Sequence, residues 1–195
     1  TKAYDFTKAH ILQSAEDSLR NLQTDYLDVM LLHRPDLLMD PDEVAEAFEL
    51  LYSSGKVRSF GVSNFTPSQI KLLQSTVPVG VHQLEISVKD VSAFDDGRLD
   101  QCTLDGIVPM AWSPLGGGNL PEGVASVLGS LASEFGVTPQ AIALAWLLQH
   151  PAGILPVIGT TKAENLEAAQ TALNIKLDRQ QWYTIYQAAT GIRLP

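Results

Sequence analysis

The chain alternates short apolar runs with longer amphipathic stretches. Residues 27–32 form a mostly apolar run of six that cannot alternate polar and apolar positions, so they predict a strand buried on both faces, as in a parallel sheet. Similar short runs predict strands over residues 56–64, 79–86, 107–112 and 155–158. The pattern therefore gives five strands, each separated from the next by a longer segment.

The longer segments show helical spacing and helix-start signals. Thr7 is the expected N-cap of a helix over residues 8–22, whose apolar residues fall on one face. Asp40-Pro41 and Thr66-Pro67 each place a capping residue before a proline at the first helical position. Helices are also expected over residues 41–55, 67–74, 95–104, 123–135, 138–150, 163–173 and after residue 178. Strands that alternate with helices predict parallel βαβ units with right-handed crossovers.

Composition describes an ordinary globular protein and excludes several partners. The 195 residues are 45% hydrophobic, which predicts a single domain over residues 1–195. A net charge of −9 argues against nucleic acid or an anionic membrane as the main partner, because both need a cationic surface. An anionic cofactor would need backbone N–H groups and a few local cations. No apolar run approaches the roughly 18 residues of a membrane span.

The single cysteine excludes an internal disulfide. Cys102 lies on an expected helix and is interpreted as a packing residue. A single cysteine fits a reducing cytosol, so we expect a cytoplasmic protein, and we predict no metal site. The chain begins at Thr1 rather than at methionine, which suggests a fragment or a processed product.

Residues suited to ligand binding follow the predicted strands. His33 ends the first, and the others contribute Ser63-Asn64, Gln83, Trp112-Ser113 and the segment 159–162. Either an open doubly wound sheet or part of a (β/α)8 barrel fits five parallel strands. No G-x-G-x-x-G motif occurs, and a barrel gathers strand ends on one face, so we favour a partial barrel of about five strands. Taken by itself, His33 fits a structural histidine at a strand end about as well as a functional one.

Five motifs resemble those of the aldo-keto reductase family over essentially the whole chain. They are LLHRPD at 31–36, GKVRSFGVSNF at 55–65, HQLE at 82–85, MAWSPLG at 110–116 and PVIGTTK at 156–162. The sequences HRPD and WSPLGGG look most like those of the bacterial oxidoreductases of that family. The resemblance implies a (β/α)8 TIM barrel that reduces small aldehydes or ketones with NADPH.

The resemblance also implies roles for individual residues. His33 resembles the histidine that orients the substrate carbonyl, and Trp112 the ring that stacks on the nicotinamide. Ser63, Asn64 and Gln83 would hold the nicotinamide carboxamide. The loop that passes over the pyrophosphate would consist of Ser113, Leu115, Gly116, Gly117 and Gly118. The adenosine 2′-phosphate would be bound by the segment of Ile158, Gly159, Thr160, Thr161 and Lys162. The structural alternatives are a turn at Ser63-Asn64, a core role for Trp112 and a solvated Lys162.

Two departures from the family pattern affect these expectations. Asn165 and Ala169 stand where the family often has an arginine for the 2′-phosphate and an asparagine for the adenine, so NADP is expected with NAD also possible. The family's catalytic aspartate, tyrosine and lysine belong to three earlier βα units that this sequence lacks. Lys2 is the one local candidate for that lysine, its alternative being a place in the loop that leads into the first helix, and Tyr4 does not replace the tyrosine.

The missing units have a physical consequence. Without the tyrosine and lysine, His33 alone is a poor acid, so the 195 residues are not expected to reduce carbonyls by themselves. Five strands also cannot close a barrel, so an amino-terminal segment or a second copy would have to cover the sheet edges. The alternatives are a catalytically silent dinucleotide-binding half-barrel and a truncated product.

Overall fold

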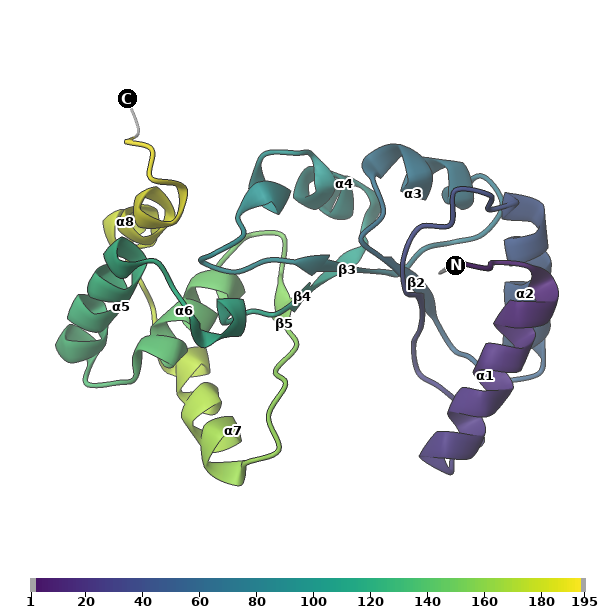
Figure 1. Cartoon of the computed structure of the whole chain (residues 1–195), viewed down its shortest axis with the longest axis horizontal. Coiled ribbons are helices and arrows are strands. Elements are labelled where there is room, and N and C mark those ends of the chain that lie inside the picture. Colours follow the sequence, from purple (N-terminus) through teal and green to yellow (C-terminus); the bar gives the residue numbers. More distant parts are fainter. Residues whose placement is uncertain (1–2, 194–195) are drawn as a thin grey trace. The chain divides into compact units, whose positions relative to one another are not determined.

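The computed structural model describes residues 3–193, in which five strands alternate with helices (Figure 1). Two compact units make up this part of the chain. The first contains the residues up to Gln83 together with Leu104–Ile107, and the second contains Leu84–Thr103 together with the residues from Val108 onward. Each unit is described by itself below.

The first unit holds three parallel strands and three helices in alternation. In chain order these are α1 (Lys8–Leu22), β1 (Met30–Leu32), α2 (Pro41–Ser53), β2 (Phe60–Ser63), α3 (Pro67–Gln74) and the first residues of β3 (Val81–Glu85). Met30 is in register with Phe60, and Gly61 with Val81, both in parallel pairs. The predicted parallel βαβ pattern is therefore confirmed here.

Local side-chain caps explain why these helices start where the sequence predicted. The Thr7 hydroxyl accepts from the His10 N–H at the start of α1, and the Asp40 carboxylate accepts from Asp42 at the start of α2. Thr66 and Gln69 form a reciprocal capping box at the start of α3. Each cap satisfies a backbone N–H that has no partner within the helix.

The first strand is shorter and more exposed than predicted. Leu27 forms an isolated bridge with Val57, and the ladder with β2 starts only at Met30. Val29 is 41% exposed, and Met30 and Leu31 are half-buried, so the prediction of a strand buried on both faces was wrong. Within the described residues β1 pairs only with β2, whereas all four residues of β2 are buried.

The second unit is built around a buried helix. Its elements are most of α4 (Arg98–Asp105), β4 (Val108–Trp112), α5 (Glu122–Phe135), α6 (Pro139–Leu148), β5 (Leu155–Pro156), α7 (Ala163–Gln170) and α8 (Arg179–Thr190). Met110 pairs with Leu155 in parallel. Every residue from Ala141 to Leu147 of α6 is buried. Cys102 is buried and forms no disulfide, as expected of a packing residue.

Two tryptophans join α6 to α8. The indole N–H of Trp146 donates to the Trp182 carbonyl at 3.1 Å, and that of Trp182 donates to the Trp146 carbonyl at 3.0 Å. The rings stack with centroids 5.1 Å apart, and Phe94 packs against both. The last helix is therefore held by paired polar contacts inside an aromatic cluster.

No single helix within residues 3–193 is both long and apolar enough to cross a membrane. α5 and α6 reach the required length and composition only when taken together, and they bend by 95° at the break between them.

Candidate functional site

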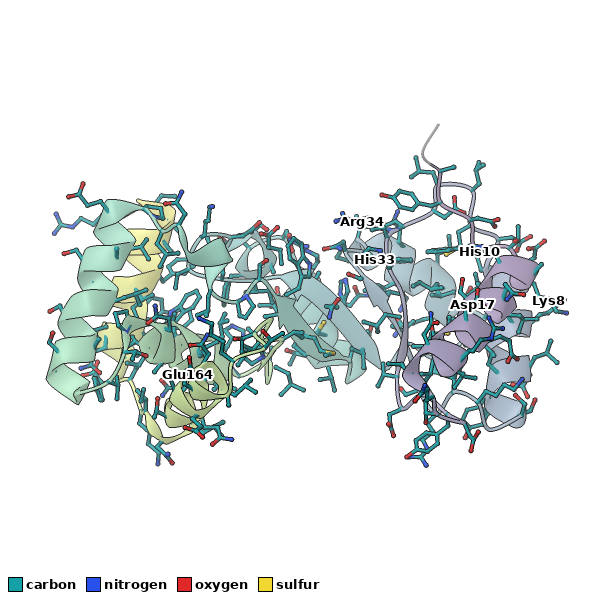
Figure 2. The ribbon with its side chains drawn as sticks, turned by 60° about the horizontal axis from the view of Figure 1, so that its bottom comes forward. Lys8, His10, Asp17, His33, Arg34 and Glu164 are labelled. Carbon is teal, nitrogen blue, oxygen red and sulfur yellow. The ribbon has the colours of Figure 1, made fainter. Side chains whose placement is uncertain are left out.

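His33 lies directly beyond the carboxyl end of β1, as predicted, and its side chain is exposed (Figure 2). The loop that follows is tied down by Asp36. One carboxylate oxygen accepts from the Phe6 N–H at 3.0 Å, and the other accepts from the Leu38 N–H at 2.9 Å. The imidazole is thus accessible while the backbone around it is fixed.

Ser63, Asn64 and Gln83 come together where the carboxyl end of β2 lies beside the middle of β3. Ser63 and Gln83 are register partners, and the Asn64 N–H donates to the Gln83 carbonyl at 2.9 Å. The Asn64 side-chain amide donates to the Ser63 hydroxyl, also at 2.9 Å. Because Leu32 is in register with Val62, His33 follows β1 at the level of Ser63. The backbone therefore gathers four predicted residues at one end of the first unit.

The start of α3 does not account for Ser63 and Asn64. That helix is capped by Thr66 and Gln69, so neither residue is needed for capping. Asn64 has a φ of 60°, a left-handed conformation that asparagine tolerates better than most non-glycine residues. Ser63 is only 2% exposed, so its hydroxyl is held in place.

A cavity of about 800 Å³ lies within the second unit, between the loop after β4, the start of α6 and the start of α7. Seven of the residues predicted to bind a dinucleotide line it: Ser113, Leu115, Gly117, Gly118, Ile158, Gly159 and Thr160. These residues come from two segments that are about 40 positions apart in the sequence. The structure therefore brings the predicted loop and the predicted phosphate segment to one cavity.

Four of the predicted residues in this unit do not line the cavity. Gly116 is buried within the loop, where an added Cβ would lie 3.0 Å from atoms of both Lys89 and Leu120. Trp112 ends β4 and is half-buried just before the loop. Thr161 and Lys162 are exposed at the start of α7. Their proposed ligand contacts remain predictions.

The loop over the cavity has a backbone that only glycine adopts easily. Gly116, Gly117 and Gly118 have φ values of 60°, 70° and 79° in succession. A Cβ on Gly117 or Gly118 would meet nothing within 4 Å, so their missing side chains leave open space. Consecutive residues of this kind can turn backbone N–H groups toward an anion.

The cavity wall is uncharged. Aliphatic side chains form most of it, and the polar groups are those of Ser113, Thr138, Gln140, Thr160 and Asn165. The Asn165 amide donates to the Thr160 hydroxyl at 3.1 Å, and the Lys162 N–H donates to the same hydroxyl at 3.3 Å. This wall suits a flat apolar group with a polar edge. An anion here would depend on backbone N–H groups, and the predicted cation Lys162 lies outside the wall.

Sequence reasoning missed part of this wall. Thr138, Pro139 and Gln140 line the cavity, but in the sequence they carry only a helix-start signal. Asn165 and Ala169 do line it, so the two positions singled out as departures from the family pattern face the cavity. Contacts of a helix start with a distant loop have no local signal that could have revealed them.

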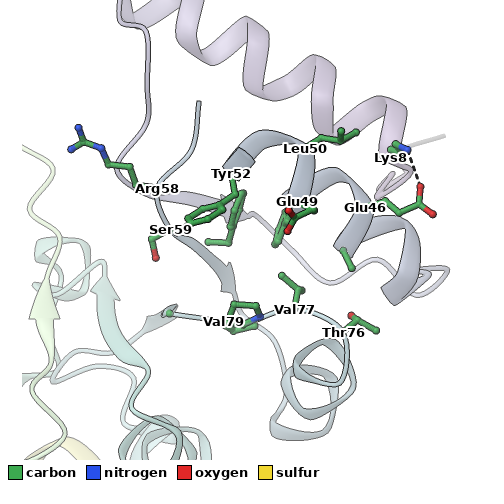
Figure 3. A pocket seen from close by; sticks show the side chains of 15 residues that line it. Lys8, Glu46, Glu49, Leu50, Tyr52, Arg58, Ser59, Thr76, Val77 and Val79 are labelled. Carbon is green, nitrogen blue, oxygen red and sulfur yellow. Dashed lines mark hydrogen bonds and ion pairs between the residues drawn. The ribbon is translucent and has the colours of Figure 1, made fainter. Parts of the chain in front are cut away.

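A second cavity, of about 830 Å³, lies in the first unit along α2 (Figure 3). Its wall includes Tyr52 and the residues that lead into β2 and β3, namely 58–60 and 76–80, and the ion pair of Lys8 with Glu46 lies at its rim. These are the amino-terminal ends of the strands, opposite to the end that carries His33. Ligand sites of parallel α/β folds lie at the carboxyl ends, so this cavity is not the candidate site.

Comparisons with known sequences agree on one family. The pattern of the family described as "Aldo/keto reductase family" matches residues 1–190. The chain is 46% identical to the uncharacterized oxidoreductase YcsN of Bacillus subtilis, over 98% of this chain and 67% of the relative. It is 43% identical to a 6-dehydroglucose reductase of Agrobacterium fabrum, over 97% of this chain and 66% of that enzyme. The chain thus spans about two thirds of the length of these relatives.

Solved structures give the same result. The thermostable aldo-keto reductase Tm1743 is similar with a TM-score of 0.89 and 29% identity, covering 94% of this chain and 67% of that protein. An aldo/keto reductase from Klebsiella pneumoniae, crystallised with NADP and acetate, has a TM-score of 0.85 and 30% identity, covering 93% of this chain and 65% of that one. This chain, whose parallel strands and helices are part of a (β/α)8 barrel, belongs to the aldo/keto reductase family.

Proposed function

We propose that this chain carries the dinucleotide-binding and carbonyl-orienting parts of a reductase that uses NADPH to reduce small aldehydes or ketones. The observation that carries the proposal is the cavity of the second unit, in which the glycine loop and the segment after β5 meet. Family relatives that bind NADP or are named as reductases support it.

The cavity wall fits the dinucleotide group by group. The open backbone at Gly117 and Gly118 allows close approach of a pyrophosphate. The aliphatic wall with Thr160 and Asn165 suits the adenosine end. Lys162, at the start of α7, is the cation we assign to the 2′-phosphate, where the helix dipole also favours an anion. NADP is therefore the expected cofactor, with NAD also accepted.

The reaction needs a hydride at the carbonyl carbon and a proton at the carbonyl oxygen. When bound, NADPH would supply the hydride. His33 is assigned to hydrogen-bond the carbonyl oxygen, which fixes the substrate and favours the developing negative charge. Ser63, Asn64 and Gln83 are assigned to the carboxamide, whose orientation decides which face of the nicotinamide meets the substrate. The tyrosine that the resemblance assigns as proton donor has no counterpart among these 195 residues.

The experiment measures binding and turnover separately. Calorimetric titration of the 195-residue chain with NADPH should give saturable one-to-one binding. The chain is then fused behind the amino-terminal third of the Bacillus subtilis relative, which supplies the earlier βα units. This fusion should oxidise NADPH in the presence of small aldehydes, at a rate that the 195-residue chain does not reach.

The outcomes separate the alternatives. NADPH binding without any carbonyl-dependent oxidation by the fusion would reject the reductase and leave a silent dinucleotide-binding module. Absence of saturable binding by the chain and by the fusion would reject both functions.

A further inference from the structure

Arg34 occupies the position next to the proposed carbonyl-orienting residue. It follows His33 directly beyond β1, both side chains are exposed, and Figure 2 shows them in the same part of the first unit. Pro35 restricts the next backbone torsion, and Asp36 ties the loop to Phe6 and Leu38. Because the backbone of this loop is fixed, the Arg34 side chain explores fewer positions than a side chain on a mobile loop.

The guanidinium of Arg34 has no partner within residues 3–193. The other two arginines of the first unit are both engaged. Arg20 pairs with Asp17 at 2.8 Å, and Arg58 pairs with Asp28 at 2.9 Å while lying 3.7 Å from the centre of the Tyr26 ring. The chain has 22 acidic residues against 13 Lys and Arg. An arginine left unpaired in so acidic a chain, beside the candidate catalytic histidine, is available for a ligand.

Apolar surface lies next to this cation. Leu37 and Leu38 are each 90% exposed, three and four residues after Arg34 in the same loop. An isolated exposed leucine is ordinary. Two adjacent leucines that are both almost fully exposed, beside a guanidinium that has no partner within residues 3–193, can give a ligand apolar as well as charged contacts. The loop can therefore meet both an anionic group and an aliphatic or aromatic body.

Carboxylate is the anion that matches one guanidinium best. Its two oxygens accept two parallel N–H bonds from the planar fork, and its single charge is balanced by the single charge of the arginine. The negative charge of the whole chain opposes any anion at long range. A preference for an anionic substrate must therefore come from a local contact.

We propose that Arg34 selects carbonyl substrates that carry a carboxylate, so that the substrates are oxo acids whose apolar part contacts Leu37 and Leu38. This inference rests on the proposed function, because it assigns a substrate class to the carbonyl that His33 orients. The carboxylate itself takes no part in the redox step. It binds while hydride and proton add across the carbonyl group.

The test compares a ligand that carries a carboxylate with its uncharged methyl ester. Ligand-observed NMR titration of the 195-residue chain, with NADP⁺ present, measures the affinity for 4-carboxybenzaldehyde and for its methyl ester. The acid should bind more tightly than the ester by about tenfold to a hundredfold, the usual range for a hydrogen bond to a charged group. Binding is read directly, so the result does not depend on turnover.

Three variants identify the source of the preference. Arg34→Gln should bring the acid-to-ester ratio of affinities close to one. Arg34→Lys keeps the charge without the planar fork and should give an intermediate ratio. Arg20→Gln, which removes another exposed arginine of the same unit, should keep the wild-type ratio. Circular dichroism checks that all three variants are folded.

Each outcome is decisive. Equal affinity of the wild-type chain for acid and ester, or an unchanged ratio in Arg34→Gln, would overturn the role of Arg34. A carboxylate preference that depends on Arg34 in a chain that does not bind NADPH would instead reject the proposed reductase and retain the carboxylate contact.

Discussion

Gly61 shows how one residue limits the packing of three strands. It lies in the middle of β2, and an added Cβ would overlap the Val81 carbonyl oxygen on the neighbouring strand. The same Cβ would lie 2.6 Å from a methyl group of Leu31 and 2.8 Å from the Val81 Cβ. Because two of these atoms belong to backbone or to a Cβ, the neighbours cannot move aside without shifting a strand.

Gly61→Ala should therefore destabilise the protein by about 3 kcal/mol, at the upper end of overpacking effects. Gly129→Ala is the matched control. It lies inside α5 with nothing within 4 Å of an added Cβ, so alanine should stabilise the fold by about 0.5–1 kcal/mol. Urea unfolding of both variants measures the two changes. Equal stability of Gly61→Ala and wild type would mean that the strands are not packed as described.

Gly117 links backbone conformation to the proposed cofactor. Asparagine tolerates the left-handed conformation, so Gly117→Asn should fold while its side chain fills the space in front of the loop. NADPH affinity should fall by at least about tenfold, the effect of losing roughly 1.4 kcal/mol of contact. Gly136→Asn, with a φ of 67° and equally open surroundings at the end of α5, should retain wild-type affinity in the same titration. A similar loss in both variants would point to general strain instead.

At the scale of elements, the last helix depends on a small number of polar contacts within an aromatic cluster. Trp146 and Trp182 exchange indole hydrogen bonds with each other's backbone carbonyls, and Phe94, His150 and Tyr186 pack around them. The Tyr186 hydroxyl donates to Asp95 at 2.9 Å. α8 is thus joined both to α6 and to the segment before α4.

Trp182→Phe should destabilise the protein by about 2 kcal/mol. The change removes one indole donor, leaves the Trp146 carbonyl without that bond and reduces ring contact. Tyr183→Phe on the same helix is the control, and it should change stability by less than about 0.5 kcal/mol. Thermal unfolding followed by circular dichroism compares them, and equal midpoints for the two variants would show that the indole pair does not hold α8.

The same cluster should make stability depend on pH. Burial lowers the pKa of His150 below its usual 6.5, and the charge of Asp100 only partly opposes this. The fold therefore favours the neutral ring, whose Nδ1 accepts from the Ala152 N–H. This contribution is fully present above the unfolded pKa and is lost as the pH falls below about 6.5 toward the lowered folded pKa.

Unfolding of wild type and His150→Gln at several pH values tests this dependence. The advantage of wild type over the variant should be largest near pH 8 and should shrink as the pH falls below about 6.5. A difference that stays constant over this range would show that the protonation of His150 is not coupled to folding.

At the scale of the whole chain, the sequence predicted the starts of helices better than the limits of strands. Helix starts at Thr7, Asp40 and Thr66 were predicted correctly because a capping side chain acts within four residues, and at Asp40 and Thr66 a first-turn proline adds to the signal. The limits of the strands were predicted less well, because they depend on pairing with a neighbouring strand. The predicted strand over 155–158 contracts to Leu155–Pro156, and the predicted helix over 163–173 ends at Gln170 before a 3₁₀ turn.

The candidate site followed the same rule. The strand-end motifs can be identified from the sequence, since each lies in a short stretch, and the ligand contacts of their residues stay predictions. Gln140 was missed because its helix start reaches the cavity only through packing. Gly116 does not line the cavity, and its packing near Lys89 and Leu120 could not be read from the sequence; its ligand contact stays a prediction. The positions of side chains around a cavity depend on contacts between distant segments.

The central claim is that a nicotinamide dinucleotide binds in the cavity between the glycine loop and the start of α7. Hydrogen–deuterium exchange with and without NADPH tests it most directly, because it locates the bound ligand along the chain. Peptides covering residues 113–120 and 158–169 should exchange more slowly when NADPH is present, while peptides of α1 should not change. Saturable binding of NADPH without protection of these two segments would contradict the account.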